Sequence, residues 1–226
     1  HGLNLLASYM FSKTISDGRG ESGAGGVSDS LPQNPLDLAA ERSLADEHRP
    51  HRFVASPVYQ LPFGRGRAFM SSAPGWVDAL LGGWSLGGIL TIESGRLASL
   101  TVLGDPSNTG GPDRPNVLGD WHMAASQRSL QEWFNTSAFT ANSPYTFGNA
   151  ARNLISGPGV FSLDAALHKE FRITERVRSQ FRAEAFNLTN TPQFGVPNAE
   201  VGNASFGQIN GASNPRNLQF ALKLIF

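Results

Sequence analysis

Hydrophobic and polar residues alternate with period two in six segments of the chain. The six segments are residues 3–11, 53–61, 84–95, 161–171, 177–188 and 217–226. Each is close to the length of a tilted β-strand that crosses a bilayer, which takes about 9–11 residues. The pattern therefore predicts an all-β protein with about six long antiparallel strands, each with one apolar and one polar face.

The alternation is sharpest in the segments 161–171 and 177–188. Their odd positions are mainly apolar, whereas their even positions carry the polar residues Asp164, His168, Glu170, Arg178, Gln180, Arg182 and Glu184. A soluble sheet turns its polar side to water and its apolar side to a core. A transmembrane β-barrel turns its apolar side to lipid and its polar side to the lumen. In the barrel interpretation, these seven residues line the lumen.

The connections between the segments differ strongly in length. They run over residues 13–52, 62–83, 96–160, 172–176 and 189–216. Outer-membrane barrels have short periplasmic turns and long extracellular loops. If the last strand descends to the periplasm, the three longest connections are extracellular, and 172–176 and 62–83 are periplasmic.

Some local signals modify this outline. Pro57 removes a hydrogen-bond donor from the segment 53–61 and weakens that strand. Pro74 and the pair Gly82–Gly83 bracket a short helix on the periplasmic side. Within the longest connection, residues 97–103 favour a strand extension and residues 129–134 favour a helical turn.

Aromatic residues fall at both ends of the strands in this orientation. The outer edge receives Phe11, Phe53 and Phe161, and the periplasmic edge receives Tyr59, Trp84, Phe171 and the terminal Phe226. Membrane barrels carry aromatic girdles at both interfaces. The positions of the rings therefore favour a barrel in contact with lipid.

Composition agrees with this interpretation and limits the partners. The 18 basic and 18 acidic side chains balance, so nothing favours binding to nucleic acid. The 25 glycines and 14 prolines are typical of strands joined by turns and loops, and the absence of cysteine excludes disulfides and thiolate metal sites. The uncharged stretch 79–92 is too short for a spanning helix, which needs about 20 residues. A membrane crossing would therefore be made by strands.

Three short stretches resemble ligand sites, but each has a simpler interpretation. His48 and His51 supply only two of the three or four ligands that zinc needs. Residues 105–113 offer oxygen ligands for calcium without the spacing of a known calcium loop, so a turn is favoured. The sequence GRGR at 64–67 lacks a phosphate-loop pattern and is expected to place two arginines at the bilayer edge. No nucleophile motif is present, and we expect neither an enzyme nor a cofactor.

The chain ends on a regular alternation, NLQFALKLIF, whose even positions are all apolar. A lipid-facing last strand that ends in phenylalanine resembles the C-terminal assembly signal of bacterial outer-membrane proteins. That resemblance implies recognition by the barrel-assembly machinery through Phe220, Leu222, Leu224 and Phe226.

Sequence blocks along nearly the whole chain resemble TonB-dependent receptors of the Oar-like kind. In order, the blocks are QNPLDLAAERSLADEHRPHRFVAS, VYQLPFGRGRAF, LLGGWSLGGILTIESG, WFNTSAF, TFGNAARNLISGPG, SLDAALHKEFRITER, FRAEAFNLTNTPQFGVPN and NPRNLQFALKLIF. Such receptors have a barrel of about 22 strands with a plug inside. The resemblance implies that residues 1–226 are the C-terminal part of the barrel, without the plug and the N-terminal strands.

The resemblance also implies a function and partners. The function would be energy-coupled uptake of an unidentified large solute across the bacterial outer membrane. The partners would be outer-membrane lipid, the assembly machinery, the rest of the receptor, and the TonB complex through the missing N-terminal part. The alternative is a soluble secreted β-sandwich that binds carbohydrate, which differs in the face that meets water.

The charges around the 172–176 turn predict a register. Opposed residues must share a face, so paired residue numbers must sum to an even value. A sum of 348 places Glu170 opposite Arg178, whereas a sum of 350 sets Arg172 against Arg178 and opposes like charges. We therefore expect the register with the sum of 348.

Overall fold

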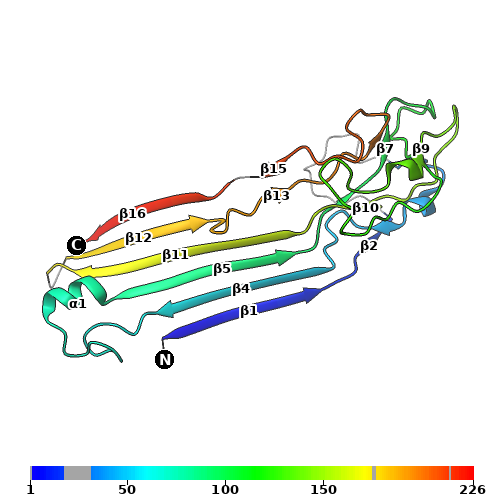
Figure 1. The fold of residues 1–226 in the computed structure, drawn as a ribbon. Coiled ribbons are helices and arrows are strands. Elements are labelled where there is room, and N and C mark those ends of the chain that lie inside the picture. The colour runs from blue at the N-terminus through cyan, green and yellow to red at the C-terminus, as the bar shows by residue number, and fades with distance from the viewer. Residues whose placement is uncertain (1, 18–31, 175–176, 214) are drawn as a thin grey trace.

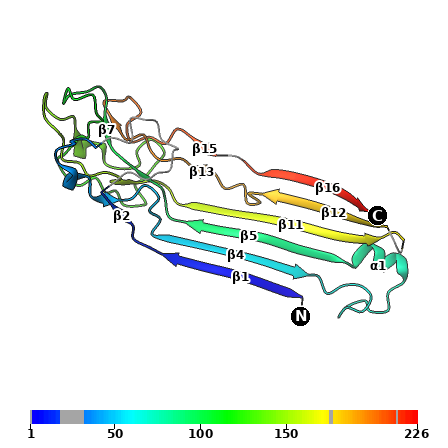
Figure 2. The same cartoon turned by 180° about the vertical axis from the view of Figure 1, so that it is seen from behind.

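The structure, a computed structural model, describes residues 2–17, 32–174, 177–213 and 215–226. Six long strands lie side by side in one antiparallel sheet, and the long connections fold together into a head at one end (Figures 1 and 2). In their order across the sheet, the strands are β1 (Leu3–Phe11), β4 (His51–Gln60), β5 (Trp84–Glu93), β11 (Val160–Arg172), β12 (Arg178–Phe186) and β16 (Asn217–Ile225). The predicted all-β antiparallel fold with six long strands is confirmed.

The register gathers most of the apolar side chains of the six strands on one face of the sheet; Leu6, Ile89 and Ile225 are among the exceptions. One cross-strand row consists of Leu3, Tyr59, Leu86, Leu167, Ala183 and Phe220. The opposite face carries a row of Gln60, Ser85, His168, Arg182 and Ala221. In the described residues no second sheet covers the apolar face, and most of its large side chains are exposed. A soluble sandwich would pack this face against a second sheet, so the exposed apolar face argues against that alternative.

Pro57 weakens its strand on one side only. Pairing of β4 with β1 is continuous through Pro57, which lies opposite Leu5. Pairing of β4 with β5 stops after Ala55 and resumes at Val58. Because Pro57 lacks a backbone N–H, the pairing of β4 with β5 is interrupted locally, and the strand continues on both sides of the interruption.

The register predicted for the hairpin of β11 and β12 is wrong by two residues. Arg172 pairs with Arg178, which is the sum of 350, and Glu170 lies opposite Gln180. Two residues of the predicted turn 172–176, at positions 175 and 176, lie outside the described residues. The described part is tighter than expected, because the backbone N–H groups of Ile173 and Thr174 both donate to the Val177 carbonyl, each over 3.0 Å. These hydrogen bonds extend the hairpin beyond residue 172 and set its register.

The connection between β4 and β5 contains the predicted short helix, α1 (Gly75–Leu81). It starts after Pro74 and ends at Gly82. The carboxylate of Asp78 in the helix accepts a hydrogen bond from the Arg65 backbone N–H over 2.6 Å, which ties the preceding loop to the helix. Gly64 has a φ of +115° and packs so closely that an added Cβ would lie 2.7 Å from this carboxylate. No helix in the described residues is long and apolar enough to cross a membrane.

The head is built from short strand pairs and turns of the long connections. Its elements are β2 (Ile15–Ser16), η2 (Leu38–Glu41), β3 (Ser43–Leu44), β6 (Leu97–Ala98), β7 (Thr101–Val102), β8 (Asn116–Val117), η3 (Thr136–Ala138), β9 (Phe139–Thr140), β10 (Ile155–Ser156), β13 (Gln193–Phe194), β14 (Glu200–Val201) and β15 (Ala212–Ser213). Residues 97–103 are extended in part, as β6 and β7, but these two short strands pair with β10 and β14 and do not prolong β5. The part of the 13–52 connection at positions 18–31 lies outside the described residues.

The helical turn expected at 129–134 is wrong. The backbone there bonds to a distant segment instead: Trp133 N–H donates to the Gly207 carbonyl, and Ile209 N–H donates to the Leu130 carbonyl, over 3.0 and 2.8 Å. The nearest helical turn is η3, which begins after Asn135. Long-range backbone pairing has replaced local helix formation.

The hydrophobic core of the described chain lies in this head. A cluster of buried side chains comprises Leu100, Phe134, Ala138, Phe139, Ala150 and Ile155. The Phe134 ring meets the rings of Phe139 and Phe206 edge to face, with centroids 5.8 and 5.3 Å apart. Aromatic pairs in this geometry add to the energy of burial. The head is therefore a packed unit, and the sheet carries no comparable core of its own.

A buried charge network joins the connections 13–52 and 96–160. Arg114 Nη1 donates to both carboxylate oxygens of Glu41 over 2.8 Å, and Arg152 Nε donates to the Glu41 backbone carbonyl over 3.1 Å. Gln33 N–H donates to the same carboxylate over 3.2 Å. All four residues are almost completely buried. A buried charge pair of this kind needs such additional hydrogen bonds to be tolerated.

Candidate functional site: the two faces of the sheet

The polar face of β11 and β12 holds the seven residues predicted to line a lumen. The register places all of them on one side of the sheet, although not in the pairs expected. Arg178 Nη1 lies 3.3 Å from a Glu170 carboxylate oxygen, and Arg182 Nη2 lies 2.6 Å from a carboxylate oxygen of Glu184. Exposed ion pairs contribute about 0–1 kcal/mol each, so this face behaves as a solvated polar wall. Its orientation toward a lumen stays a prediction.

The polar wall extends over two further strands, which the sequence analysis missed. Glu93 of β5 lies on the same face, and its carboxylate forms ion pairs with two arginines. Its carboxylate oxygens lie 3.1 Å from Arg49 Nε and 3.3 Å from Arg52 Nε. The alternation of apolar and polar positions within β5 and β4 already places Glu93 and Arg52 on the polar side of their strands, so the sequence contained the signal for both.

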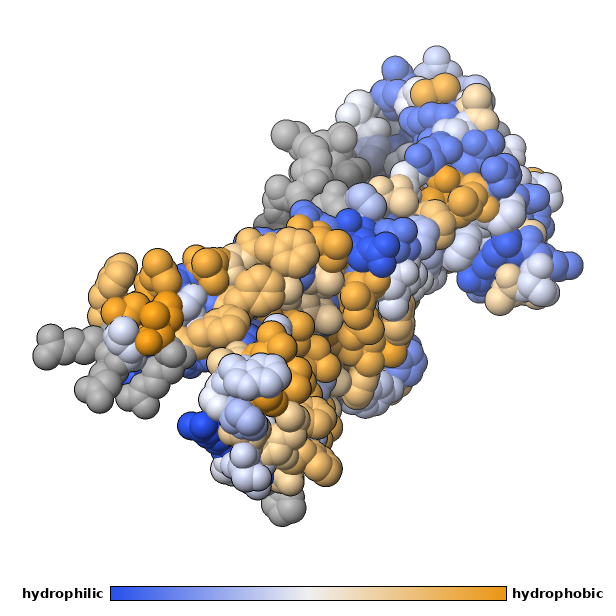
Figure 3. Space-filling model, turned by 60° about the vertical axis from the view of Figure 1, so that its left-hand side comes forward, coloured by the Kyte–Doolittle hydropathy of each residue, from blue (hydrophilic) through white to orange (hydrophobic). Residues whose placement is uncertain are grey.

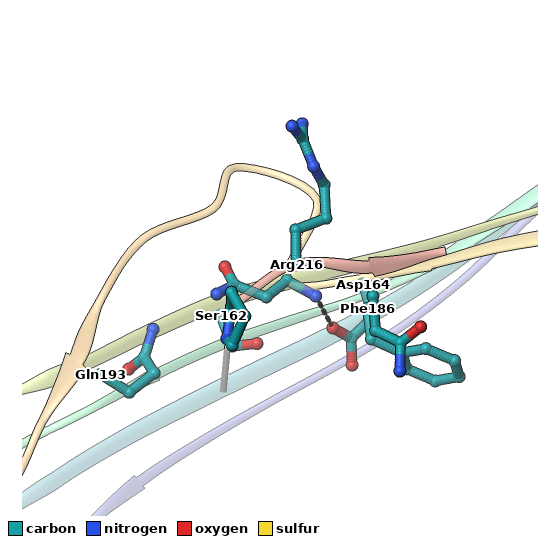
Figure 4. A pocket seen from close by; sticks show the side chains of 8 residues that line it. Ser162, Asp164, Phe186, Gln193 and Arg216 are labelled. Carbon is teal, nitrogen blue, oxygen red and sulfur yellow. Dashed lines mark hydrogen bonds between the residues drawn. The ribbon is translucent and has the colours of Figure 1, made fainter. Parts of the chain in front are cut away.

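A pocket of about 620 Å³ lies at the head end of this polar face. It is lined by Ser162, Asp164, Phe186, Asn187, Gln193, Pro215, Arg216 and Asn217. Figure 4 shows the Asp164 carboxylate pointing into the group of lining residues, where it accepts a hydrogen bond of 2.8 Å from the Asn187 N–H. The Arg216 side chain extends away from Asp164 and donates to the Leu188 carbonyl over 3.2 Å.

The lining of this pocket carries both signs of charge. Asp164 is the one acidic residue among those that line it, and Arg216 is the one basic residue. Ser162, Asn187, Gln193 and Asn217 add hydroxyl and amide groups. The pocket at the junction of the sheet and the head is therefore lined mainly by polar residues.

On the apolar face, aromatic rings gather at both ends of the strands, as the sequence predicted. Toward the head, one cross-strand row consists of Tyr9, Phe53, Ile92 and Phe161. Phe11 lies one pair closer to the head, with its ring 5.1 Å from that of His51. At the far end, the Trp84 ring meets Phe181 edge to face at 6.4 Å, with Tyr59 and Phe171 in neighbouring rows. Their role as membrane girdles stays a prediction.

Lys169 is a charged residue on the apolar face that the sequence analysis missed. It is only 2% exposed, and it lies between Trp84 and Phe181 in the cross-strand register. Its Nζ donates to the carbonyls of Leu80, over 3.1 Å, and Gly82, at the end of α1. It also lies over the rings of Trp84 and Phe171 at 5.0 and 4.8 Å. The sequence signal was a single lysine at an odd position within an apolar stripe, beside a predicted helix end.

The last strand, β16, forms one edge of the sheet and presents the residues of the predicted assembly signal. Phe220, Leu222 and Leu224 lie on the apolar face and are largely exposed, and Phe226 follows the strand. Within the described residues, β16 pairs with β12 alone. An exposed edge of this kind offers unpaired backbone groups for pairing with a further strand. Recognition by assembly machinery stays a prediction.

The stretches that resembled metal sites are engaged in local contacts. His48 Nδ1 accepts a hydrogen bond from the Thr14 N–H over 3.2 Å, and burial lowers the pKa of His48 below its ordinary value. His51 Nδ1 instead lies 2.7 Å from the Tyr9 hydroxyl. Asp105 folds the 105–113 turn, because its carboxylate accepts backbone hydrogen bonds led by Gly110, which hold its pKa below the usual range. The described ranges contain no group of three His, Cys, Asp or Glu side chains that could hold a metal ion.

Comparison with known proteins gives one match. The family model described as an outer membrane beta barrel domain matches residues 1–219. No curated protein and no solved structure gives a significant match. The matched range includes the first five long strands, the head and the beginning of β16.

Proposed function

Because this chain belongs to the family of outer-membrane β-barrel domains, we propose that it forms part of the barrel wall of a TonB-dependent receptor. Membership in the family places the chain in the bacterial outer membrane. In the proposed receptor, the apolar face of its sheet meets lipid. In the proposed receptor, further strands complete the barrel and a plug occupies it. The receptor takes up a large solute with energy from the TonB complex.

The observation that carries the proposal is the ordered series of Oar-like blocks along nearly the whole chain. These blocks are not confined to the strands. The blocks WFNTSAF and TFGNAARNLISGPG supply Phe134, Ala138, Phe139, Ala150 and Ile155, which are core residues of the head. Alternation alone would resemble any membrane strand, whereas blocks that build a folded extracellular head favour a specific kind of receptor.

The arrangement of the molecule suits that role. The head lies at one end of the strands, where a receptor would meet solutes from outside. The polar wall then runs from the pocket at Asp164 toward the opposite end, past His168 and Glu170. A plug inside the barrel would face this wall, and the contact with TonB would be made by the plug side of the receptor.

The experiment is co-purification of the full-length outer-membrane protein with the periplasmic domain of TonB. We expect retention of the intact protein and loss of retention when the segment that precedes these barrel strands is deleted. A matched preparation that lacks Phe226 but is folded should still retain TonB, since that residue belongs to assembly. Failure of the intact, folded protein to bind TonB would overturn the proposal and leave a barrel of another function.

A further inference from the structure

The connection between β4 and β5 presents an unusual set of exposed apolar side chains. In α1, Trp76 is 73% exposed and Leu80, one turn later, is 61% exposed. Residues at i and i+4 lie on the same side of a helix, so these two form one apolar surface. Phe63 and Phe69 of the preceding loop are also exposed, with ring centroids 5.7 Å apart. A water-exposed turn would gain nothing from this many apolar side chains.

This surface is continuous with the lipid-facing side of the sheet. Lys169 and Trp84, both on the apolar face, hold the end of α1: Lys169 Nζ and Trp84 Nε1 each donate to the Leu80 carbonyl, over 3.1 and 3.0 Å. The helix is therefore fixed to the apolar side at the end of the strands. Figure 3 shows hydrophobic residues covering the strand region that comes forward, whereas the head is largely hydrophilic.

The charges of the same segment suit an anionic surface. Arg65 and Arg67 are exposed on the loop before α1. Asp78 is the one acidic residue of the 62–83 connection, and it is engaged with the Arg65 backbone N–H. Arginines beside an apolar helix face are typical of segments that lie in the headgroup region of a bilayer.

We infer that α1 and the loop before it form an in-plane anchor in the headgroup region of the phospholipid leaflet at this end of the barrel. Trp76 and Leu80 enter the boundary between headgroups and acyl chains, to a depth of about 5–10 Å. Arg65 and Arg67 meet lipid phosphates. Lys169 neutralises the carbonyl end of the helix against the barrel wall. The anchor depends on the lipid contact of the apolar face and is independent of coupling to TonB.

The test is a depth measurement with spin labels on the full-length protein, reconstituted in phosphatidylethanolamine and phosphatidylglycerol vesicles. This chain contains no cysteine, so single labels can be placed cleanly within it. One label replaces Leu80 (Leu80→Cys), and the control replaces Leu118 (Leu118→Cys), a leucine of the head that is 68% exposed. At position 80, collisions with oxygen should exceed collisions with a water-soluble nickel chelate. At position 118, that order should be reversed.

A second label at Trp76 (Trp76→Cys) should repeat the result at position 80, and it keeps the test decisive if one variant fails to fold. The anchor is overturned if the nickel chelate reaches position 80 as readily as position 118, because the helix would then lie in water. It is also overturned if both oxygen and nickel are excluded there, because a protein partner would then cover the helix.

Discussion

Replacing Glu41 with glutamine (Glu41→Gln) should open the head while leaving the sheet intact. The side chains of Glu41 and Arg114 are only 3% and 5% exposed, and they make the two hydrogen bonds of 2.8 Å described above. Arg152 lies close by, with its Nε 3.8 Å from the same carboxylate. Glutamine keeps the size of the side chain but removes its charge. Both guanidinium groups would then remain buried without the carboxylate that balances them.

The expected size of the effect follows from the burial of the pair. Removing one partner of a buried ion pair costs about 3–5 kcal/mol, because the remaining charge is uncompensated. At about 1.4 kcal/mol for each factor of ten, the open state of the head should become about 100- to 4,000-fold more populated. Hydrogen exchange would report this change at the amides of Leu118 and Ala150. Their N–H groups bond within the head to the carbonyls of Ala138 and Pro115, over 2.8 and 3.0 Å.

The matched control is Glu170→Gln in the polar wall. That ion pair with Arg178 has side chains that are 57% and 55% exposed, so its loss should cost about 0–1 kcal/mol. Equal exchange rates in the Glu41 and Glu170 variants would refute the reasoning. Loss of protection in the long strands together with the head would also refute it, because the head would then not be a separately stabilised unit.

Three further predictions concern other parts of the chain. Burial lowers the pKa of His48, so the folded protein favours its neutral form. The contribution of His48 to the stability of the fold is full above the ordinary histidine pKa of about 6.5 and is lost as the pH falls below it. Amide exchange at Thr14, whose N–H donates to His48, should therefore accelerate at low pH after correction for intrinsic exchange rates. Gly148→Ala should destabilise the head by about 1–3 kcal/mol in denaturant titration, because an added Cβ would lie 1.9 Å from the Arg114 carbonyl oxygen. The control Gly119→Ala should not destabilise it, because the space around Gly119 is open. Phe226→Ala should lower the amount of the protein in the outer membrane, measured by immunoblot of membrane fractions. The ring is 91% exposed in the structure, and even its full burial would contribute only about 2–3 kcal/mol, so lost burial energy alone would not explain a large decrease. A normal amount would count against an assembly signal.

The strands and their faces could be predicted because period two is a local property of the sequence. The first predicted segment, 3–11, coincides with β1, and the other five long strands agree within two residues at every end. The head could not be predicted in this way, since its contacts join residues that are far apart in the chain. Gln33 Nε2 donates to the Gly148 carbonyl across 115 positions, and Arg152 Nη2 donates to the Ser16 carbonyl across 136. No periodic pattern records such pairs.

Lys169 shows a different limit of pattern analysis. When a strand face is identified from its apolar residues, a single charged residue on that face is counted as an exception and is not explained. The reason for the lysine lies on another element, at the carbonyl end of α1, which the alternation of β11 does not describe. A charged residue on a lipid-facing stripe therefore indicates a nearby group that compensates it.

The error in the β11–β12 register left the assignment of faces unchanged. The predicted and observed sums, 348 and 350, are both even, and a shift of two residues keeps every side chain on its own side, whereas a shift of one would have reversed all of them. The repulsion that we used to reject 350 is worth about 0.2–1 kcal/mol across a strand pair. Against it stand three turn hydrogen bonds, among Ile173, Thr174 and Val177, each worth about 0.5–1.5 kcal/mol. Although Glu170 lies opposite Gln180, its carboxylate is still 3.3 Å from Arg178 Nη1 across the strand pair, so the ion pair is kept in the observed register. In a hairpin with a solvated polar face, the turn therefore decides the register, and the charges adjust to it.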